Sequence, residues 1–413
     1  MSLAVGTPPP PLWNRHTVTE QEAPMDERHR DDLIRAVRDL APELSTRAGD
    51  IEQARELPAD LLDRLRAAGC FRMFVPRSHG GYEADLRTGL TVLETLARAD
   101  GSTGWTVMIG AETPHLLAML PRERFDKVYA DGPDVVVAGG FAPQGRAELA
   151  DGGYLVDGRW AFASGARHAD WIFGNCVLTG DGQPLPGPTG RPPETRSMLF
   201  PAERVTVLDT WHTLGLRGTG SDDVVLDGLF CPAEESFDLF TGVPCVPGPG
   251  FVAPLVHFVL HLGAVAVGIA GGALDDMTAL LADGRQRLYA RTPLADSPAV
   301  RERLGRADLN VRAARALLHA LADDLWAACA GDPAALVALH PTISASLPWV
   351  TEVCAAAVDT CYRAAGGGAA RDSSPVQRRF RDIHTFAQHA AAAEGWLGNN
   401  GAQLLGRPVE LAY

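Results

Sequence analysis

Two histidines near the end of the chain have a type and spacing that could serve catalysis. They lie in the stretch RRFRDIHTFAQHAAAAEGW (378–396), where His384 and His389 are five positions apart. The composition of this stretch predicts one helix, opened by Arg381 and Asp382. A histidine with an unperturbed pKa of about 6.5 can exchange a proton near neutral pH. Two interpretations stay open: a helix that only packs, or one that holds catalytic groups over a cofactor.

A serine and an aromatic residue share a second stretch, GRWAFASGARHADW (158–171). Two strands are predicted to turn at Ser164 and Gly165, because glycine accepts backbone conformations that other residues resist. Ser164 offers a hydroxyl group beside the ring of Phe162. The pattern suits a β-turn with a buried aromatic ring, and it equally suits a site that uses the hydroxyl group.

A third stretch, DTWHTLGLRGTGSDDVVLDGLFCP (209–232), combines an aromatic ring, a cation and hydroxyl groups. Trp211 offers a flat surface and Arg217 a fixed positive charge. Thr219 and Ser221 add hydroxyl groups and backbone N–H groups, which suit a phosphate or a planar heterocycle. The alternative is a hairpin with an ordinary arginine–aspartate pair.

A glycine turn precedes a group of arginines in AAGGGAARDSSPVQRRFRDIHTFAQHA (364–390). Flexible glycines followed by cations suit a phosphate or pyrophosphate group. The alternative is a loop followed by a solvated basic face. The residues concerned are Gly366, Gly367, Gly368, Arg371, Arg378, Arg379 and Arg381.

His257 and His261 are four positions apart, so on a helix they share one face, as metal-binding histidines do. The carboxylate of an HExxH motif does not accompany them, and a zinc site needs a third ligand. We therefore predict no metal site here.

Composition and charge exclude several classes of function. The chain has 413 residues, a net charge of −14 and no long polybasic stretch, which argues against nucleic-acid or anionic-membrane partners. Seven cysteines without CxxC spacing indicate a reducing compartment. The N-terminus lacks signal-peptide features, so we expect a cytoplasmic protein. The apolar segment 251–274 contains two histidines and is interpreted as a buried bundle helix rather than a membrane span.

The sequence changes texture three times and predicts an α+β protein that is mostly α. Residues 1–25 are expected to form a flexible leader. Residues 26–130 show apolar residues at helix spacing, and residues 131–240 show alternating β-branched and polar runs typical of a small, mostly antiparallel β domain. Residues 241–413 return to long, alanine-rich helices.

The stretches 158–171, 209–232 and 364–390, in this order and at this spacing, resemble the acyl-CoA dehydrogenase superfamily. Within it, the chain is most similar to the flavin-dependent monooxygenases of two-component systems, which hydroxylate phenols and related molecules. The resemblance covers nearly the whole chain from residue 31. It implies an N-terminal helical domain, a middle β-barrel domain and a C-terminal four-helix bundle.

The resemblance also separates two chemistries. Dehydrogenases of this superfamily need a carboxylate base to remove a proton from an acyl thioester. The matching positions here carry Ala390, after His389, and Phe258, so neither is acidic. The resemblance therefore implies a monooxygenase. An acyl-CoA dehydrogenase-like dehydrogenase or oxidase, with Glu394 as a displaced base, is the alternative. A non-catalytic flavin-binding member is a third interpretation, against which the retention of Ser164 and His389 argues.

The resemblance assigns roles residue by residue. His389 and Ser164 match catalytic positions, with His389 as proton donor or hydrogen-bond partner, and His384 is expected to be structural. Glycine stands at position 139 or 140, where relatives that act on simple phenols often carry a serine, so a different substrate is implied. The expected flavin-binding residues are Phe162, Ser164, Trp211, Arg217, Thr219, Ser221, Gly367 and Arg378, and the expected substrate residues are His115, Phe258 and His261.

The implied cofactors are a reduced flavin (FMNH2 or FADH2) and O2, which form a C4a-hydroperoxyflavin. The segment YARTPLADSPAV contains Arg291 but lacks the Phe-Gly pair that, in dehydrogenases of the superfamily, helps to hold the adenylate of FAD. This difference favours a flavin that binds in the reduced state and leaves in the oxidised state. A GxGxxG dinucleotide fold is absent from the sequence, so we expect a separate NAD(P)H flavin reductase. The substrate is expected to be an aromatic or polycyclic small molecule, and the assembly a homotetramer.

Overall fold

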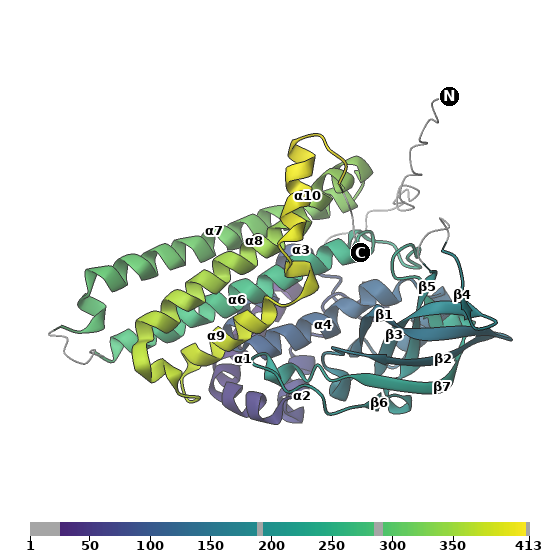
Figure 1. Ribbon diagram of the computed structural model, residues 1–413, viewed down its shortest axis with the longest axis horizontal. Coiled ribbons are helices and arrows are strands. Elements are labelled where there is room, and N and C mark those ends of the chain that lie inside the picture. The colour runs from purple at the N-terminus through teal and green to yellow at the C-terminus, as the bar shows by residue number, and fades with distance from the viewer. Residues whose placement is uncertain (1–24, 188–192, 285–291, 410–413) are drawn as a thin grey trace.

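A bundle of long helices lies beside a β-sheet, and shorter N-terminal helices pack between and beneath them (Figure 1). The computed structural model describes residues 25–187, 193–284 and 292–409. Nearly all of the predicted leader therefore lies outside the described residues, as does Arg291. The observed order of helices, sheet and helices is the one that the sequence predicted.

The N-terminal part is helical, and an aspartate caps the start of each of its two central helices, α3 and α4. Asp85 accepts a hydrogen bond from Thr88 N at 2.7 Å, and Asp100 accepts one from Thr103 N at 2.7 Å, so each carboxylate satisfies an N–H group at the start of a helix. These helices are α1 (Glu27–Ala54), α2 (Ala59–Ala67), α3 (Leu86–Ala99), α4 (Gly101–Leu117) and α5 (Arg122–Val128).

The middle part is one sheet of eight strands with the order β6-β7-β2-β1-β3-β5-β8, with β4 paired to β3. Strands β1 and β3 run parallel, and the other described pairs are antiparallel. The strands are β1 (Val137–Ala150), β2 (Gly153–Trp160), β3 (Trp171–Gly180), β4 (Gln183–Pro184), β5 (Thr195–Pro201), β6 (Thr206–Val207), β7 (Val224–Pro232) and β8 (Ser236–Phe237).

Three long helices and two shorter ones form the described C-terminal part. By length and composition α6 could cross a membrane, but 89% of its most apolar window is buried inside the protein. The interpretation of this segment as a core helix of the bundle is confirmed. The helices are α6 (Pro254–Ala282), α7 (Pro298–Cys329), α8 (Pro333–Ala365), α9 (Pro375–Phe386) and α10 (Gly395–Leu404).

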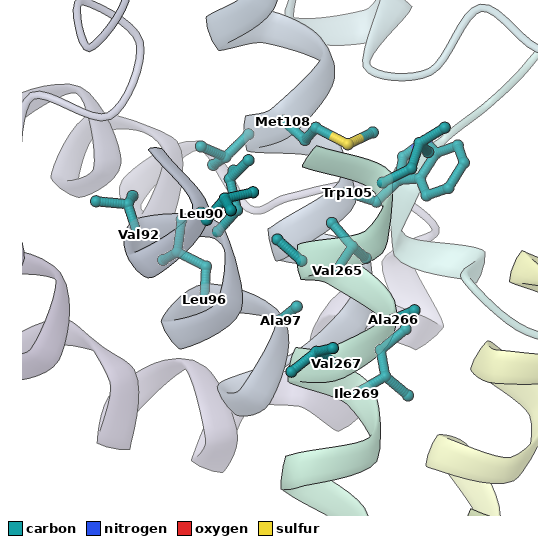
Figure 2. Close-up of a cluster of buried hydrophobic side chains, with 14 of the residues drawn as sticks. Leu90, Val92, Leu96, Ala97, Trp105, Met108, Val265, Ala266, Val267 and Ile269 are labelled. Carbon is teal, nitrogen blue, oxygen red and sulfur yellow. The ribbon is translucent and has the colours of Figure 1, made fainter. Parts of the chain in front are cut away.

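The N-terminal helices and the bundle share one hydrophobic core, where α3 and α4 pack against α6 (Figure 2). A Cβ atom at Gly268 of α6 would lie 2.6 Å from Ala97 Cβ of α3. Because glycine removes that clash, the backbones of α3 and α6 can approach closely. Helix α4 contacts α6 on one side and strand β1 of the sheet on the other. Helix α4 carries several of the site residues described below.

The prediction of one helix over residues 378–396 was wrong. Helix α9 ends at Phe386, and a short 3-10 helix, η10 (Ala390–Ala392), follows. His389 has extended backbone angles and its Nδ1 accepts a hydrogen bond from Ala391 N at 3.2 Å. This local side-chain bond competes with a continued helical ladder, although the alanines favour a helix. His389 therefore lies in a turn rather than on a helix face.

Two buried histidines in the core are held neutral. Burial, reinforced by the neighbouring His261, lowers the pKa of His115 to about 3. Burial also lowers the pKa of His257 well below its ordinary value, with His115 and His261 adding to the effect. In the unfolded chain these side chains regain a pKa of about 6.5. The unfolded state therefore binds more protons below pH 6.5, so stability is present above that pH and is lost as the pH falls.

The substitution His115→Gln is expected to weaken this pH dependence. At pH 5 the unfolded His115 is protonated while the folded one is not, a difference of about 2 kcal/mol in the free energy of unfolding. We therefore expect the fall in Tm from pH 7 to pH 5 to become smaller by about 2 °C or more in His115→Gln. His29→Gln, at an exposed histidine, is the control. Equal pH dependence in the two variants would contradict the assignment.

Candidate active site

The segment 209–223, which joins β6 to β7, is organised by a buried carboxylate. Asp222 accepts hydrogen bonds from Thr210 N and Trp211 N, both at 2.9 Å, and Arg167 Nε donates to it at 2.8 Å. Burial alone would raise the pKa of Asp222, but the N–H donors and the Arg167 guanidinium outweigh it and hold the pKa below its ordinary value. The ionised Asp222 therefore fixes the position of Trp211.

The same segment lies directly on α9. Leu216 N donates to Asp382 Oδ1 at 2.7 Å. A Cβ atom at Gly215 would lie 2.2 Å from the Arg381 carbonyl group, so this approach requires glycine. The buried Asp382 has a pKa raised to about 6, because burial and the nearby Asp100 outweigh its hydrogen bond from Leu216. The Arg-Asp pair predicted to open a helix instead anchors the segment.

A relay of buried hydroxyl groups connects this segment to α4. Trp105 Nε1 donates to Ser164 Oγ at 2.9 Å, Ser164 Oγ lies 2.6 Å from Ser221 Oγ, and Ser221 Oγ lies 2.7 Å from Thr219 Oγ1. Thr219 Oγ1 donates to Leu216 O at 2.8 Å, so its proton is used there. Ser221 must then donate to Thr219, and Ser164 to Ser221. A ligand at this relay would meet oxygen lone pairs.

An exposed aromatic platform lies on the outer side of the relay. The Phe162 side chain is 70% exposed. Its backbone has a φ of 67°, a conformation that residues other than glycine rarely adopt. Its ring centroid lies 6.2 Å from that of the half-buried Trp211, in an edge-to-face arrangement. A large exposed ring held in a strained conformation indicates a binding surface rather than a packing contact.

The predicted cations are divided between the interior and the surface. Arg217 is exposed, donates to Thr213 O at 2.8 Å and lies 3.6 Å from Glu52. Arg378 is half-buried on α9, and Gly367 lies exposed in the 3-10 helix η9 (Gly366–Ala370) that follows α8.

Arg379 and Arg381, by contrast, are buried. Arg379 donates to the carbonyl groups of residues 97, 98 and 99 at the end of α3. Arg381 binds Glu52 and donates to Leu214 O at 2.9 Å. These two arginines hold the fold together, so only part of the predicted group of cations faces a possible phosphate.

His389 lies between the relay and a cavity. Its ring centroid is 5.6 Å from that of Trp105, which donates to Ser164, and 6.0 Å from that of Phe258, which lines the cavity. Because Nδ1 accepts a hydrogen bond, the proton of the neutral ring is on Nε2. Burial lowers the pKa of His389 to about 4. The expectation that it titrates near neutral pH is therefore corrected: it is a neutral N–H donor at pH 7.

His384 is separate from this site. Its Nε2 lies 2.9 Å from Asp359 Oδ1 on α8, and its ring packs on Phe380. These contacts join α9 to α8 and agree with the structural role expected for His384.

The cavity lies between α4, the sheet and the start of α6, and its empty volume is about 400 Å³ including solvent at its mouth. Of the predicted substrate residues, His115 and Phe258 line it, and His261 lies behind it. Gly139, one of the two positions where a serine was expected in phenol-specific relatives, also lines it. The full lining is Ile109, Glu112, Thr113, His115, Leu116, Gly139, Phe141, Phe173, Pro254, Leu255 and Phe258.

A buried carboxyl group, that of Glu112, belongs to this lining and is held from behind by a histidine of α6. The Glu112 carboxyl group hydrogen-bonds His261 Nδ1. Burial raises the pKa of Glu112, and the charge and hydrogen bond of His261 oppose that rise. Among the described residues, no group of three or more possible metal ligands surrounds His257 and His261.

Two residues of this site were not identified from the sequence. Trp105 joins the relay to His389, and Glu112 lies in the cavity wall. Glu112 and His115 are three positions apart on α4, a spacing that places both on one helix face and could have indicated Glu112. The position of Trp105 follows from the packing of α4 and has no local signal.

Models of the acyl-CoA dehydrogenase N-terminal domain and C-terminal domain match residues 27–120 and 260–394. Indole-3-acetate monooxygenase of Pseudomonas putida is 31% identical over 91% of this chain and 92% of its own length. The oxygenase subunit HsaA, a flavin-dependent monooxygenase of Rhodococcus jostii, is 31% identical over 85% of this chain and 92% of its own length.

Solved structures agree with these relatives. The 3-HSA hydroxylase from Rhodococcus sp. RHA1 is 27% identical, superposes with a TM-score of 0.84 and covers 92% of this chain and 98% of its own. XiaF from Streptomyces sp., in complex with FADH2 and glycerol, is 26% identical with a TM-score of 0.84, over 93% of this chain and 97% of its own. The chain belongs to the family of flavin-dependent monooxygenases that share the acyl-CoA dehydrogenase fold.

Proposed function

We propose that this chain is the oxygenase component of a two-component monooxygenase, which uses reduced flavin and O2 to hydroxylate an aromatic or polycyclic small molecule. The observation that carries the proposal is the place of His389, between the Trp105–Ser164 relay and the apolar cavity. A planar cofactor at the relay and an aromatic molecule in the cavity would then meet across one neutral histidine. The names of the relatives, which are monooxygenases and hydroxylases, support the same activity.

The residues present fit a flavin. Phe162 and Trp211 offer ring surfaces to a planar heterocycle, and the relay offers oxygen atoms whose own protons are used internally. Arg217, together with Gly367 and Arg378, would meet its phosphate side. When bound, the reduced flavin supplies the two electrons that activate O2. The chain's own residues orient the rings and exclude water from the reacting atoms.

His389 acts in this proposal through its Nε2–H group. A neutral donor in a dry environment makes a strong hydrogen bond to oxygen without releasing a proton to solvent. Trp105 contacts the His389 ring and donates a hydrogen bond to Ser164, so Ser164 lies on the other side of Trp105 from His389. We therefore propose that His389 supports oxygen transfer by a hydrogen bond and that Ser164 orients the flavin.

A separate NAD(P)H-dependent reductase would deliver the flavin, as FMNH2 or FADH2. The relatives include an FADH2-dependent resorcinol hydroxylase described as an oxygenase component. This description supports a system in which one protein reduces the flavin and another uses it. All seven cysteines are free, which supports a cytoplasmic location.

We also propose that the chain assembles as a homotetramer through its C-terminal helices. Helix α10 projects from the bundle (Figure 1). It exposes Leu397 and its last residue, Leu404, and the following Leu405 is also exposed, while Trp349 is exposed on α8, against which α10 packs. Such a cluster of large apolar side chains is typical of a surface that another protein covers.

The dehydrogenase or oxidase alternative assigned its base to Glu394. That residue is exposed, next to the start of α10, and not in the cavity. A base must lie within reach of the proton that it removes. The geometry therefore favours the monooxygenase.

Phe162→Ala is expected to weaken binding of reduced flavin about tenfold, because the loss of one aromatic contact and its buried area is worth about 1.4 kcal/mol. Anaerobic titration of the protein with FMNH2 and FADH2 measures the affinity. Phe230, on β7, is also an exposed phenylalanine, so Phe230→Ala is the matched control and should bind reduced flavin as tightly as the parent. Wild-type affinity in Phe162→Ala would remove the platform from the flavin site.

His389→Leu is expected to reduce product formed per flavin oxidised by about tenfold or more, with hydrogen peroxide released instead. His389→Asn, which keeps an N–H donor, should retain more product. Because His389 is neutral above about pH 4, the product yield should not titrate near pH 6.5. His384→Leu, in the neighbouring turn of α9, is the control and should match the parent. Unchanged yield in His389→Leu would exclude the assigned role.

Leu404→Glu combined with Leu405→Glu is expected to convert the tetramer into smaller species, because buried charges without partners oppose association. Light scattering after size-exclusion chromatography gives the mass. Leu309→Glu, at an exposed leucine on α7, is the control. A parent protein that is monomeric at micromolar concentration would refute the tetramer proposal directly.

A further inference from the structure

The cavity wall is apolar except at one face of α4. Among its lining residues the polar ones are Glu112, Thr113 and His115, consecutive or nearly so on that helix. Thr113 Oγ1 donates its proton to Gly110 O at 2.8 Å, so it has no proton left for a ligand. Glu112 keeps a small exposed fraction, 7%, while it lines the cavity. A molecule in the cavity therefore has the carboxyl group of Glu112 as a hydrogen-bond acceptor, beside the oxygen atom of Thr113 and a ring nitrogen of the neutral His115.

His261 holds that carboxyl group in place. Its Nδ1 hydrogen-bonds Glu112 Oε1, and its ring stacks on Phe74 with centroids 4.9 Å apart. A Cβ atom at Gly89 would lie 3.1 Å from His261 Nε2, so glycine makes room for this ring. Among the described residues, His261 Nε2 has no hydrogen-bond partner. With one polar contact and close packing, His261 fixes the orientation of Glu112 and leaves the other carboxyl oxygen for a ligand.

The charge of this pair restricts the ligand. Glu112 and His261 together can be electrically neutral with one shared proton, either as an ion pair or as two neutral groups. Removing an uncompensated charge from water is unfavourable, so the dry cavity has little tolerance for a second carboxylate. The neighbours that face the pair, His115 on α4 and His257 on α6, have low pKa values and supply no positive charge.

We infer that Glu112, oriented by His261, determines the specificity of this cavity for uncharged aromatic molecules that carry a hydroxyl or ring N–H group. The donor of the substrate binds the free carboxyl oxygen, and the ring lies on Phe258 and Phe141, whose own rings stack with centroids 5.6 Å apart. An aromatic acid of the same shape is rejected, because its carboxylate adds a negative charge close to Glu112. This inference rests on the proposed function for the identity of the cavity as the substrate site.

Matched pairs of compounds test the inference by binding. The pairs are 3-methylindole with indole-3-acetate, resorcinol with 3,5-dihydroxybenzoate, and 2-naphthol with 6-hydroxy-2-naphthoate. Calorimetric titration of the full chain gives a Kd for each compound. We expect the uncharged member to bind at least about tenfold more tightly in at least one pair. Equal binding within every pair, or no binding of any of the six compounds, overturns the inference.

Two variants locate the preference. Glu112→Gln keeps the size of the side chain and replaces its acid group with a neutral amide, and Glu112→Met also removes the acceptor. We expect the preference to fall below about threefold in both, with 3-methylindole, resorcinol and 2-naphthol binding more weakly to Glu112→Met. Thr113→Val, at the adjacent lining residue, is the control and should keep the preference. A preference unchanged in a folded Glu112→Gln, or lost in Thr113→Val, overturns the inference.

Product analysis separates this inference from the proposed function. A preference in binding without any hydroxylated product, when reduced flavin and O2 are supplied, would refute the proposed function and leave the specificity assignment in place. Hydroxylation of both members of each pair at equal rates would refute the specificity assignment and leave the proposed function in place.

Discussion

The backbone of Leu216 is the point on which the candidate flavin site depends. Its N–H group donates to the buried Asp382 of α9, and its carbonyl group accepts from both Trp211 Nε1 at 2.9 Å and Thr219 Oγ1 at 2.8 Å. Leu216 has a φ of 49°, a conformation that costs free energy for a leucine and persists because these three bonds hold it. One residue thus connects the bundle, the aromatic platform and the hydroxyl relay. The β domain and the helices form one site because of this contact.

Buried charges, rather than surface ones, make that connection rigid. Arg379 and Arg381 on α9 donate to backbone carbonyl groups of α3 and of the segment 209–223, and Arg381 also pairs with Glu52 of α1. A buried guanidinium group needs its donors satisfied, so these bonds fix the relative positions of three helices and the segment. Removing one partner of such a buried pair, for example Glu52, leaves the other charge uncompensated, which strongly destabilises the fold.

The sequence predicted the order of the parts but not the partners of individual side chains. Helix and strand periodicity are local properties, and the helical, β and helical parts appear in the structure in the predicted order. The role of an arginine depends on what surrounds it. Arg379 and Arg381 were grouped with Arg378 as possible phosphate ligands, and only the tertiary structure shows that the first two face inward. His389 shows the same limit, since one side-chain hydrogen bond ends the helix that its alanine neighbours favour.

The distribution of carboxyl groups explains how this fold serves an oxygenase rather than a dehydrogenase. The two positions where the resemblance to dehydrogenases implies a base carry Phe258 and Ala390, and the Phe258 ring lies near His389 and lines the cavity. The carboxyl group that the cavity does contain, Glu112, is bonded to His261, a partner that competes for its free electron pairs. A base must be free to take a proton from substrate, whereas an acceptor that orients substrate must be held still. A fold shared with dehydrogenases therefore says little about chemistry until the partner of each buried carboxyl group is known.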